Sequence, residues 1–324
     1  MIKSVLIANR GEIAIRIART ARRMGIKTYV VRTAKEPEAV YLSAADAVIN
    51  FPETDGNIPE FLDIDRLVGL AREYKIDSLH PGYGYLSENA ELAERCRDNG
   101  IVFIGPSPEV IRLMGDKVAA KGIAAQSGVP MLGASQGAVH TLDEARKIAK
   151  RLGYPVIIKA VSGGGGRGMR IVHHQDELEQ LYKIATAEAQ VAFNDPSVFI
   201  EKYLENPKHI EFQIVADNYG NVVHLGEREC SIQRKHQKLM EEAPSPALDE
   251  RLRKKMAAAA VSLAKQAGYQ SLGTVEFLLD HQKHFYFMEM NTRIQVEHPV
   301  TEEITGIDLV ELQFNIAAGR KLPL

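Results

Sequence analysis

A glycine-rich segment directly after a lysine is the sharpest chemical feature of this sequence. It reads Lys159-Ala-Val-Ser-Gly-Gly-Gly-Gly-Arg-Gly168 and lies between apolar runs at 156–159 and 169–172 that predict strands. The backbone N–H groups of such a loop can fold over phosphates, with Lys159 as a fixed cation at its base. Four consecutive glycines also lose much conformational entropy on folding. The segment therefore predicts a phosphate-binding hairpin tip, with an ordinary flexible hairpin as the alternative.

Two better-known glycine motifs do not fit this segment. A G-x-G-x-x-G pattern can be read from Gly163, Gly165 and Gly168. That dinucleotide fingerprint leads from a strand into a helix, however, and here a strand is expected to follow. The G-K-[ST] ending of a Walker A loop does not occur in the segment. Both motifs are excluded.

Two carboxylates and an amide are expected to meet on a hairpin further along the chain. If the chain turns at 281–283, Glu276 lies opposite or diagonal to Glu289, within cross-strand reach. Asn291 shares the face of Glu289, because strand side chains alternate with a period of two. The flanking residues are apolar, so unpaired acids would be costly there. These oxygens are ligands of the kind that Mg²⁺ takes beside nucleotide phosphates, and two solvent-facing acids are the alternative.

The residues directly after this hairpin alternate polar and apolar side chains. If the segment is extended, Arg293, Gln295 and Glu297 line one face beside the metal acids. A cation, an amide and a carboxylate there can bind a small anion and then deprotonate it. A polar edge strand without chemistry is the alternative.

Three weaker signals accompany these motifs. Residues 201–204 end a predicted strand, where a hinge can hold a nucleotide base. Residues 229–238 are basic, which by itself usually marks a solvated loop. The pattern His209-x-Glu211 resembles a zinc-deaminase motif, but no Pro-Cys-x-x-Cys follows it, so that interpretation is dismissed.

The elements that position these residues follow from hydrophobic periodicity. Up to residue 104, short apolar strand runs at 5–8, 28–31, 76–79 and 101–104 are separated by amphipathic helix patterns at 13–24, 64–74 and 88–98. Repeated strand–helix units predict a parallel, Rossmann-like open sheet. Later patterns predict an α+β unit at 154–203, strands at 210–216 and 222–225, and helices at 251–267 and 309–318.

Composition limits the classes of protein that fit. The 324 residues suggest two or three domains, at about 150 residues per domain. Forty basic against 42 acidic residues argue against general nucleic-acid binding. The first twelve residues lack a signal-peptide core, and no stretch resembles a membrane helix. With Cys96 and Cys230 expected as reduced thiols, we predict a soluble, mixed α/β, cytoplasmic protein.

Taken together, the motifs resemble the biotin carboxylase family of ATP-grasp ligases. The resemblance runs through essentially the whole chain and is carried by eight motifs in order, at 8–14, 80–89, 103–106, 114–117, 159–168, 201–207, 233–238 and 289–302. It implies an α/β fold in which a Rossmann-like pre-ATP-grasp domain (1–114) and a helical linker (115–134) precede an ATP-grasp lid (135–203). An antiparallel ATP-grasp core, 204–324, would follow.

The resemblance also implies roles for individual residues. Those expected around ATP are Lys117, Lys159, Gly163, Gly164, Gly165, Gly166, Glu201, Lys202, Leu204, His209, Gln233 and His236. Those expected to hold magnesium or manganese are Glu276, Glu289 and Asn291. Arg293, Gln295 and Val296 would bind bicarbonate and Glu297 would activate it. Lys238 would stabilise the transferring charge as carboxyphosphate forms, and biotin would lie near Tyr83 and Gly84.

The resemblance further implies partners and an incomplete core. A biotin carboxyl carrier protein and a carboxyltransferase component are the expected partners, and a homodimer is compatible with the family. Family members continue for more than a hundred residues beyond the point where this chain stops and supply a further arginine there, so we expect this chain to be a fragment.

Two other functions stay open at the level of sequence. One is a different bicarbonate-using ATP-grasp ligase, such as a carbamoyl-phosphate or purine-pathway enzyme. That ligase should lack the 80–89 and 233–238 motifs, which are present here. The other is a nucleotide-binding fragment that is inactive without its C-terminal segment.

Overall fold

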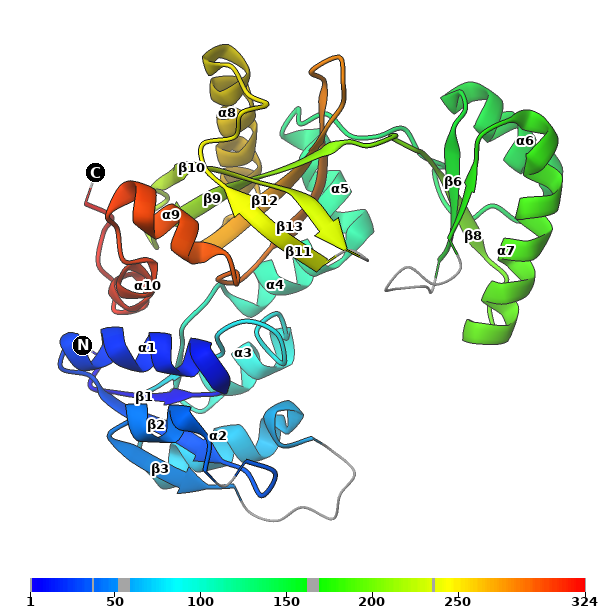
Figure 1. Cartoon of the computed structure of the whole chain (residues 1–324). Helices are drawn as coiled ribbons and strands as arrows, with labels where there is room; N and C mark the ends of the chain where they lie inside the picture. Colours follow the sequence, from blue (N-terminus) through cyan, green and yellow to red (C-terminus); the bar gives the residue numbers. More distant parts are fainter. Residues whose placement is uncertain (1, 37, 52–58, 162–168, 235–236, 324) are drawn as a thin grey trace. The chain divides into compact units, whose positions relative to one another are not determined.

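The computed structural model describes residues 2–36, 38–51, 59–161, 169–234 and 237–323 (Figure 1). The chain divides into two compact units. The first unit comprises Met1–Val129, Lys208–Leu278 and Phe287–Leu324, and the second comprises Pro130–Pro207 and Leu279–Tyr286.

The first unit contains the predicted parallel sheet, with strand order β3-β2-β1-β4-β5. Its strands are β1 (Ser4–Ile7), β2 (Lys27–Arg32), β3 (Ala47–Asn50), β4 (Ser78–His80) and β5 (Val102–Phe103). Its helices are α1 (Gly11–Arg23), α2 (Ile64–Glu73) and α3 (Ala90–Asp98), with short 3₁₀ turns at Val40–Ala44 and Glu60–Leu62. The apolar stripe of α1, Ile13, Ile17 and Ala21, is fully buried, as its spacing predicts. The Rossmann-like architecture is thus confirmed.

Helices α4 (Pro108–Gly115) and α5 (Lys117–Gln126) follow the parallel sheet. Ser107 accepts a hydrogen bond from the backbone of Val110 at the start of α4. The Asp116 carboxylate accepts from two backbone N–H groups of the first turn of α5. These caps satisfy N–H groups that a helix terminus leaves without partners. They fix Lys117 at the first position of α5.

The first unit also contains a five-stranded sheet with the order β11-β10-β9-β12-β13. Its strands are β9 (Lys208–Ala216), β10 (Val222–Arg234), β11 (Gln237–Glu242), β12 (Ser271–Leu279) and β13 (Phe285–Asn291). Strand β9 alternates polar His209, Glu211 and Gln213 with apolar residues, of which Phe212 packs against Phe277 of β12. The sheet therefore has one polar and one apolar face.

Three helices accompany this sheet: α8 (Glu250–Gln266), α9 (His298–Thr305) and α10 (Leu309–Ala317). The buried side chains of α8 are all apolar, and the helix packs on β9 and β10. Helix α9 also contacts β10. Side chains of α10 share a buried cluster with α1, which includes Phe314 and Ile17.

Two sequence-based expectations for this sheet were wrong. The 222–225 strand continues to Arg234 and pairs with β11, so 229–234 and 237–238 lie in paired strands and not in a solvated loop. Pairing of the two strands, with Gln233 opposite Lys238, satisfies their backbone N–H and C=O groups. Local composition does not reveal this pairing. Residues 292–297 are not extended: β13 ends at Asn291 and the chain turns into α9 at His298.

Within its described residues, the second unit is a three-stranded antiparallel sheet, β7-β6-β8, with two helices. Its elements are α6 (Leu142–Leu152), β6 (Val156–Ala160), β7 (Arg170–Val172), a 3₁₀ turn (Gln175–Glu177), α7 (Leu178–Phe193) and β8 (Val198–Lys202). Ala145 and Ala149 of α6 pack in a buried cluster with Val156 and Ile158 of β6. Helix α6 was not anticipated, although Thr141 caps it by accepting from the backbone of Glu144. No helix in the described part of the chain combines the length and apolar character that crossing a membrane requires.

Candidate active site

The polar face of the five-stranded sheet gathers polar side chains, most of them ionisable, from all five strands. Strand β11 contributes Lys238, β10 contributes Arg228, β9 contributes His209 and Glu211, β12 contributes Glu276, and β13 contributes Glu289 and Asn291. Several of these groups are buried, and buried charges persist only when they are paired.

Lys238 lies at the centre of this cluster and binds three carboxylates. Its Nζ is 2.5 Å from Glu297 Oε1, 2.6 Å from Glu211 Oε2 and 3.0 Å from Glu276 Oε1. Burial alone would lower the pKa of Lys238, but the three carboxylates raise it overall. Burial opposes ionisation of Glu297 as well, yet Lys238 holds the pKa of Glu297 below its usual range. The lysine is therefore an ammonium and Glu297 a carboxylate at neutral pH.

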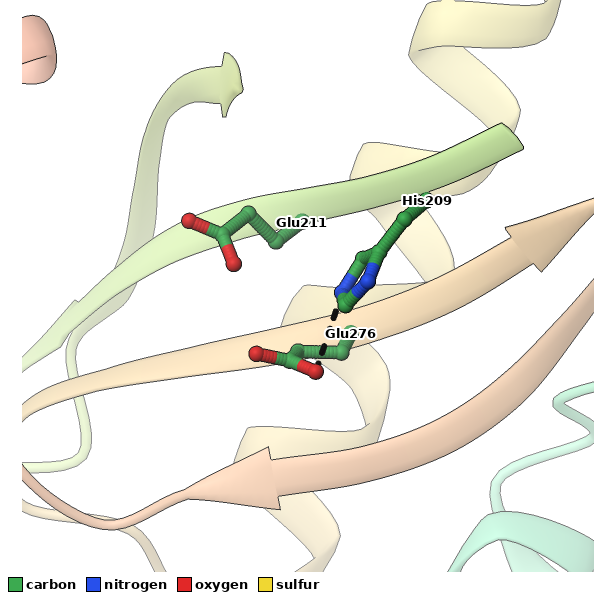
Figure 2. Close-up of side chains that lie close together, drawn as sticks. All are labelled: His209, Glu211 and Glu276. Atoms are coloured by element: carbon green, nitrogen blue, oxygen red, sulfur yellow. Dashed lines mark ion pairs between the residues drawn. The ribbon is translucent and has the colours of Figure 1, made fainter. Parts of the chain in front are cut away.

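His209 joins this group from the start of β9, two residues before Glu211, as Figure 2 shows. Its Nε2 is 3.0 Å from Glu276 Oε2, and its Nδ1 is 2.9 Å from the side-chain nitrogen of Gln233. An amide nitrogen can only donate, which favours Nδ1 as the acceptor and a ring proton on Nε2, the nitrogen that faces Glu276. Burial would lower the pKa of His209, but Glu276 raises it overall. Ligand atoms of His209, Glu211 and Glu276 lie within 4.8 Å of one another.

The three residues predicted to hold a metal also meet on this face. Asn291 Nδ2 donates to Glu276 Oε1 over 2.9 Å, and both side chains are buried. Glu289 keeps an open side to solvent. The pKa of Glu289 is raised first by the partial loss of water around its carboxylate and then by the negative charges of Glu276 and Glu88. A divalent cation relieves repulsion between carboxylates, and these oxygens are Mg²⁺ ligands, so the residues fit the metal.

The predicted anion-binding residues lie in the turn between β13 and α9. Gln295 and Glu297 are buried, whereas Val296 is 60% exposed. Arg293 is held by Glu88, whose Oε2 accepts from Nε over 3.0 Å, and by Asn291, whose Oδ1 accepts from Nη2 over 3.0 Å. The turn thus places Arg293, Gln295 and Glu297 beside the carboxylate cluster, although the segment is not a strand.

The loop after β4, which contains Tyr83 and Gly84, is fixed by side chains beneath it. Asn9 Nδ2 donates to the carbonyl oxygens of Pro81 and Tyr83, each over 2.8 Å. Gly82 has a φ of +64°, and a Cβ there would lie 2.8 Å from Asn9 Nδ2. Only glycine fits this close approach without displacing Asn9.

Four of the residues predicted to contact a nucleotide lie in the described part of the second unit. Lys159 of β6 and Glu201 of β8 form an ion pair of 2.5 Å. Lys202 Nζ donates to the carbonyl oxygens of Gly153 and Tyr154, each over 2.9 Å, and burial lowers its pKa. Leu204 follows β8 and is half-buried. Gly163, Gly164, Gly165, Gly166 and His236 lie outside the described residues.

Three residues of the site, Arg228, Glu88 and Glu211, were not assigned a role from the sequence. Arg228 pairs with Glu211 inside the sheet, and Glu88 holds Arg293. The dismissed His209-x-Glu211 pattern carries a usable signal, because residues two apart share one face of a strand. The sequence gives no comparable signal for Arg228, because the burial of its guanidinium depends on partners from other strands. Lys117 lies close enough to Glu289 to lower its pKa, against the raising effect of burial.

Comparison with known proteins defines the class of this fold and site. Residues 1–111 match the family described as the biotin carboxylase N-terminal domain, and residues 116–324 match the ATP-binding domain of the carbamoyl-phosphate synthase L chain. A parallel N-terminal sheet followed by antiparallel sheets is the mixed α/β architecture of biotin carboxylase ATP-grasp structures. The chain belongs to the biotin carboxylase family of ligases.

Individual relatives support this membership. The chain is 54% identical to a biotin carboxylase of Nostoc sp., covering 99% of this chain and 71% of that protein. It is 48% identical to the mitochondrial pyruvate carboxylase of Homo sapiens, covering 99% of this chain and 27% of that protein. It matches the biotin carboxylase domain dimer of Hydrogenobacter thermophilus 2-oxoglutarate carboxylase, solved with MgADP, ADP and bicarbonate. That match has a TM-score of 0.90 and 48% identity, and covers 100% of this chain and 71% of the other.

Proposed function

We propose that this chain carries the ATP- and bicarbonate-dependent carboxylation of biotin, the first half-reaction of a biotin-dependent carboxylase. The observation that carries the proposal is the partly buried ion pair between Lys238 and Glu297, in a turn where Arg293 binds Asn291 and Gln295 binds Glu276. A carboxylate held ionised next to two anion-binding side chains is suited to bind bicarbonate and remove its proton.

The reaction then follows from the charges of the site. Glu297 takes the proton of bicarbonate, and the oxygen that is freed attacks the γ-phosphorus of ATP to give carboxyphosphate and ADP. Lys238, which is an ammonium, stabilises the negative charge that moves during this transfer. Arg293, Gln295 and Val296 hold the anion in place while this occurs.

The remaining residues bind the nucleotide and the acceptor. Lys117, Lys159, Glu201, Lys202, Leu204, His209, Gln233 and His236, with the loop Gly163, Gly164, Gly165 and Gly166, surround ATP. Glu276, Glu289 and Asn291 hold Mg²⁺ or Mn²⁺, which when bound neutralises phosphate charge. Tyr83 and Gly84 lie against biotin. Carboxyphosphate breaks down to CO₂ and phosphate, the phosphate takes the proton of the ureido N–H, and the nitrogen binds the CO₂.

The wider assembly is part of the same proposal. We assign 1–114 to a pre-ATP-grasp domain, 115–134 to a linker, 135–203 to a lid and 204–324 to a catalytic core. A biotin carboxyl carrier and a carboxyltransferase component are the proposed partners, because this chain matches only part of a pyruvate carboxylase. A homodimer is proposed from the dimer reported for the Hydrogenobacter domain. Cytoplasmic localisation stays a prediction, since that human relative is named mitochondrial.

The test is release of ADP from Mg-ATP by the purified chain, with and without bicarbonate and with and without free biotin. Turnover that requires bicarbonate, rises with biotin and is lost in Glu297→Gln supports the proposal. A matched control is Glu303→Gln, an exposed acid of α9 outside the site. Binding of Mg-ATP without turnover would instead identify a nucleotide-binding half-site.

A further inference from the structure

Arg228 is the bulkiest fully buried side chain in the described part of the chain. It lies on β10 directly opposite Glu211 of β9. Every N–H direction of its guanidinium meets an acceptor, and five donors are all that arginine has. The acceptors are Glu211 Oε1 (2.6 Å), Gln213 Oε1 (2.9 Å), Thr301 Oγ1 (2.7 Å), Thr274 Oγ1 (3.4 Å) and Gln295 Oε1 (2.8 Å).

One of these acceptors is a proposed bicarbonate residue. The carbonyl oxygen of Gln295 points at Arg228, so its amide nitrogen points the other way and donates to Glu276 Oε1 over 3.0 Å. Reversing the amide would turn its NH₂ group against the guanidinium and its carbonyl oxygen against a carboxylate. Both contacts would be repulsive, so Arg228 and Glu276 together fix the orientation of Gln295.

A second acceptor leads to Lys238. Glu211 shares its carboxylate between Arg228, through Oε1, and Lys238, through Oε2 at 2.6 Å. With one oxygen fixed by Arg228, the other is held toward the ammonium. The position of Lys238 therefore depends in part on a residue that does not touch it.

Stability alone does not account for this arrangement. Burying an arginine and a carboxylate costs desolvation free energy. Apolar residues of similar volume often stabilise a core equally well. What an apolar residue cannot do is hold an amide and a carboxylate in defined orientations. An anion needs N–H donors, so a site that binds bicarbonate requires the nitrogen of Gln295, and not its oxygen, on the cluster side.

We propose that Arg228 is a positioning residue for bicarbonate. Protein acceptors occupy all five of its donors, so it acts by fixing the amide of Gln295 and the carboxylate of Glu211. The inference rests on the proposed function, because it concerns the same anion site. It predicts a defect in bicarbonate use and not in nucleotide binding.

The test compares Arg228→Lys with Arg253→Lys. Both changes keep a positive charge beside a buried acid, since Arg253 Nε binds Glu227 Oε1 over 2.8 Å, but Arg253 has no contact with Gln295. A lysine cannot supply the five fixed donors of arginine. We expect Arg228→Lys to raise the KM for bicarbonate about tenfold or more and to leave the KM for ATP within about twofold. Arg253→Lys should change neither constant.

A second, more conservative variant, Thr301→Val, keeps the proposal testable if Arg228→Lys does not fold. Thr301→Val removes one acceptor of Arg228 at nearly constant volume, and should raise only the bicarbonate KM, by about threefold. The proposal would be overturned if Arg228→Lys and Thr301→Val both left the KM for bicarbonate unchanged. It would also be overturned if they raised the KM for bicarbonate and the KM for ATP equally.

Crystal structures of Arg228→Lys and the parent chain separate this inference from the proposed function. If the parent releases no ADP with bicarbonate, the proposed function fails, and the side-chain positions alone decide the role of Arg228. Reversal or displacement of the Gln295 amide in the variant supports positioning. Gln295 and Glu211 unmoved would reject it.

Discussion

The ammonium of Lys238 lies 2.5 Å from Oε1 of Glu297, and this pair joins β11 to the turn that precedes α9. The pair sets the resting state of the site. Lys238 lowers the pKa of Glu297, against the opposing effect of burial, so the proposed base is ionised before bicarbonate arrives. Bicarbonate must then compete with Lys238 for Glu297, or bind both at once.

Replacing Lys238 with methionine tests this pair. The change leaves Glu211, Glu276 and Glu297 without their shared cation, so the pKa of Glu297 rises and the transferring charge loses a partner. We expect bicarbonate-dependent ADP release to fall about 100-fold or more. Lys254→Met, on the exposed side of α8, is the control and should retain activity. Full activity in Lys238→Met would remove this lysine from the mechanism.

Lys159 provides a test confined to the second unit. Its ion pair with Glu201 places a cation at the start of the glycine segment, where phosphates would bind. We expect Lys159→Ala to weaken Mg-ATP binding about tenfold or more, measured by calorimetry. Lys150→Ala, an exposed lysine of α6 in the same unit, is the matched control. Equal affinity in the two variants would refute a phosphate-binding role for Lys159.

Glu88 is expected to influence bicarbonate through Arg293. Its carboxylate accepts from Nε of Arg293 and, over 2.9 Å, from the backbone N–H of Thr292. Glu88→Gln keeps the shape but weakens the hold on the guanidinium, and should raise the bicarbonate KM about three- to tenfold. The neighbouring exposed acid gives the control, Glu91→Gln, in the first turn of α3. A KM that moves equally in both variants would show a general charge effect and no specific link.

Local patterns predicted much of the fold and the convergence of Glu276 with Asn291. The stripe of α1 and the alternation of β12 and β13 are encoded by residues a few positions apart, and the expected hairpin brings the two side chains within 2.9 Å. The extension of β10 and the existence of β11 could not be predicted in the same way. Their residues are polar, and pairing between strands, which is not a local property, determines that they are strands.

The turn at 292–297 shows a second limit of local patterns. Alternating polar residues predicted an extended segment, yet Glu88 binds the backbone of Thr292 and Gln295 is drawn to Arg228. These partners lie far away in the sequence, so tertiary contacts override the period of two. Arg228 itself could not be recognised for the same reason, since its burial depends on acceptors from β9, β12 and α9.

His80 predicts a specific dependence of stability on pH. It is fully buried, its Nδ1 accepts from the backbone of Gly82, and its Nε2 is 3.1 Å from the Gln313 oxygen. Burial lowers the pKa of His80 from 6.5 to about 3. Between these values the unfolded chain binds a proton that the folded chain does not, so stability falls as the pH falls. The loss approaches about 1.4 kcal/mol per pH unit below pH 6.

Urea unfolding of the parent chain and His80→Gln at pH 7, 6 and 5 measures this contribution. Glutamine keeps a donor for Gln313 but has no proton to bind, so the variant should lose less stability between pH 7 and pH 5 than the parent does. The difference should be about 1–2 kcal/mol. His281→Gln, at an exposed position after β12, should follow the parent. Parallel curves for His80→Gln and the parent would show that His80 accepts a proton in the folded state as readily as in the unfolded chain.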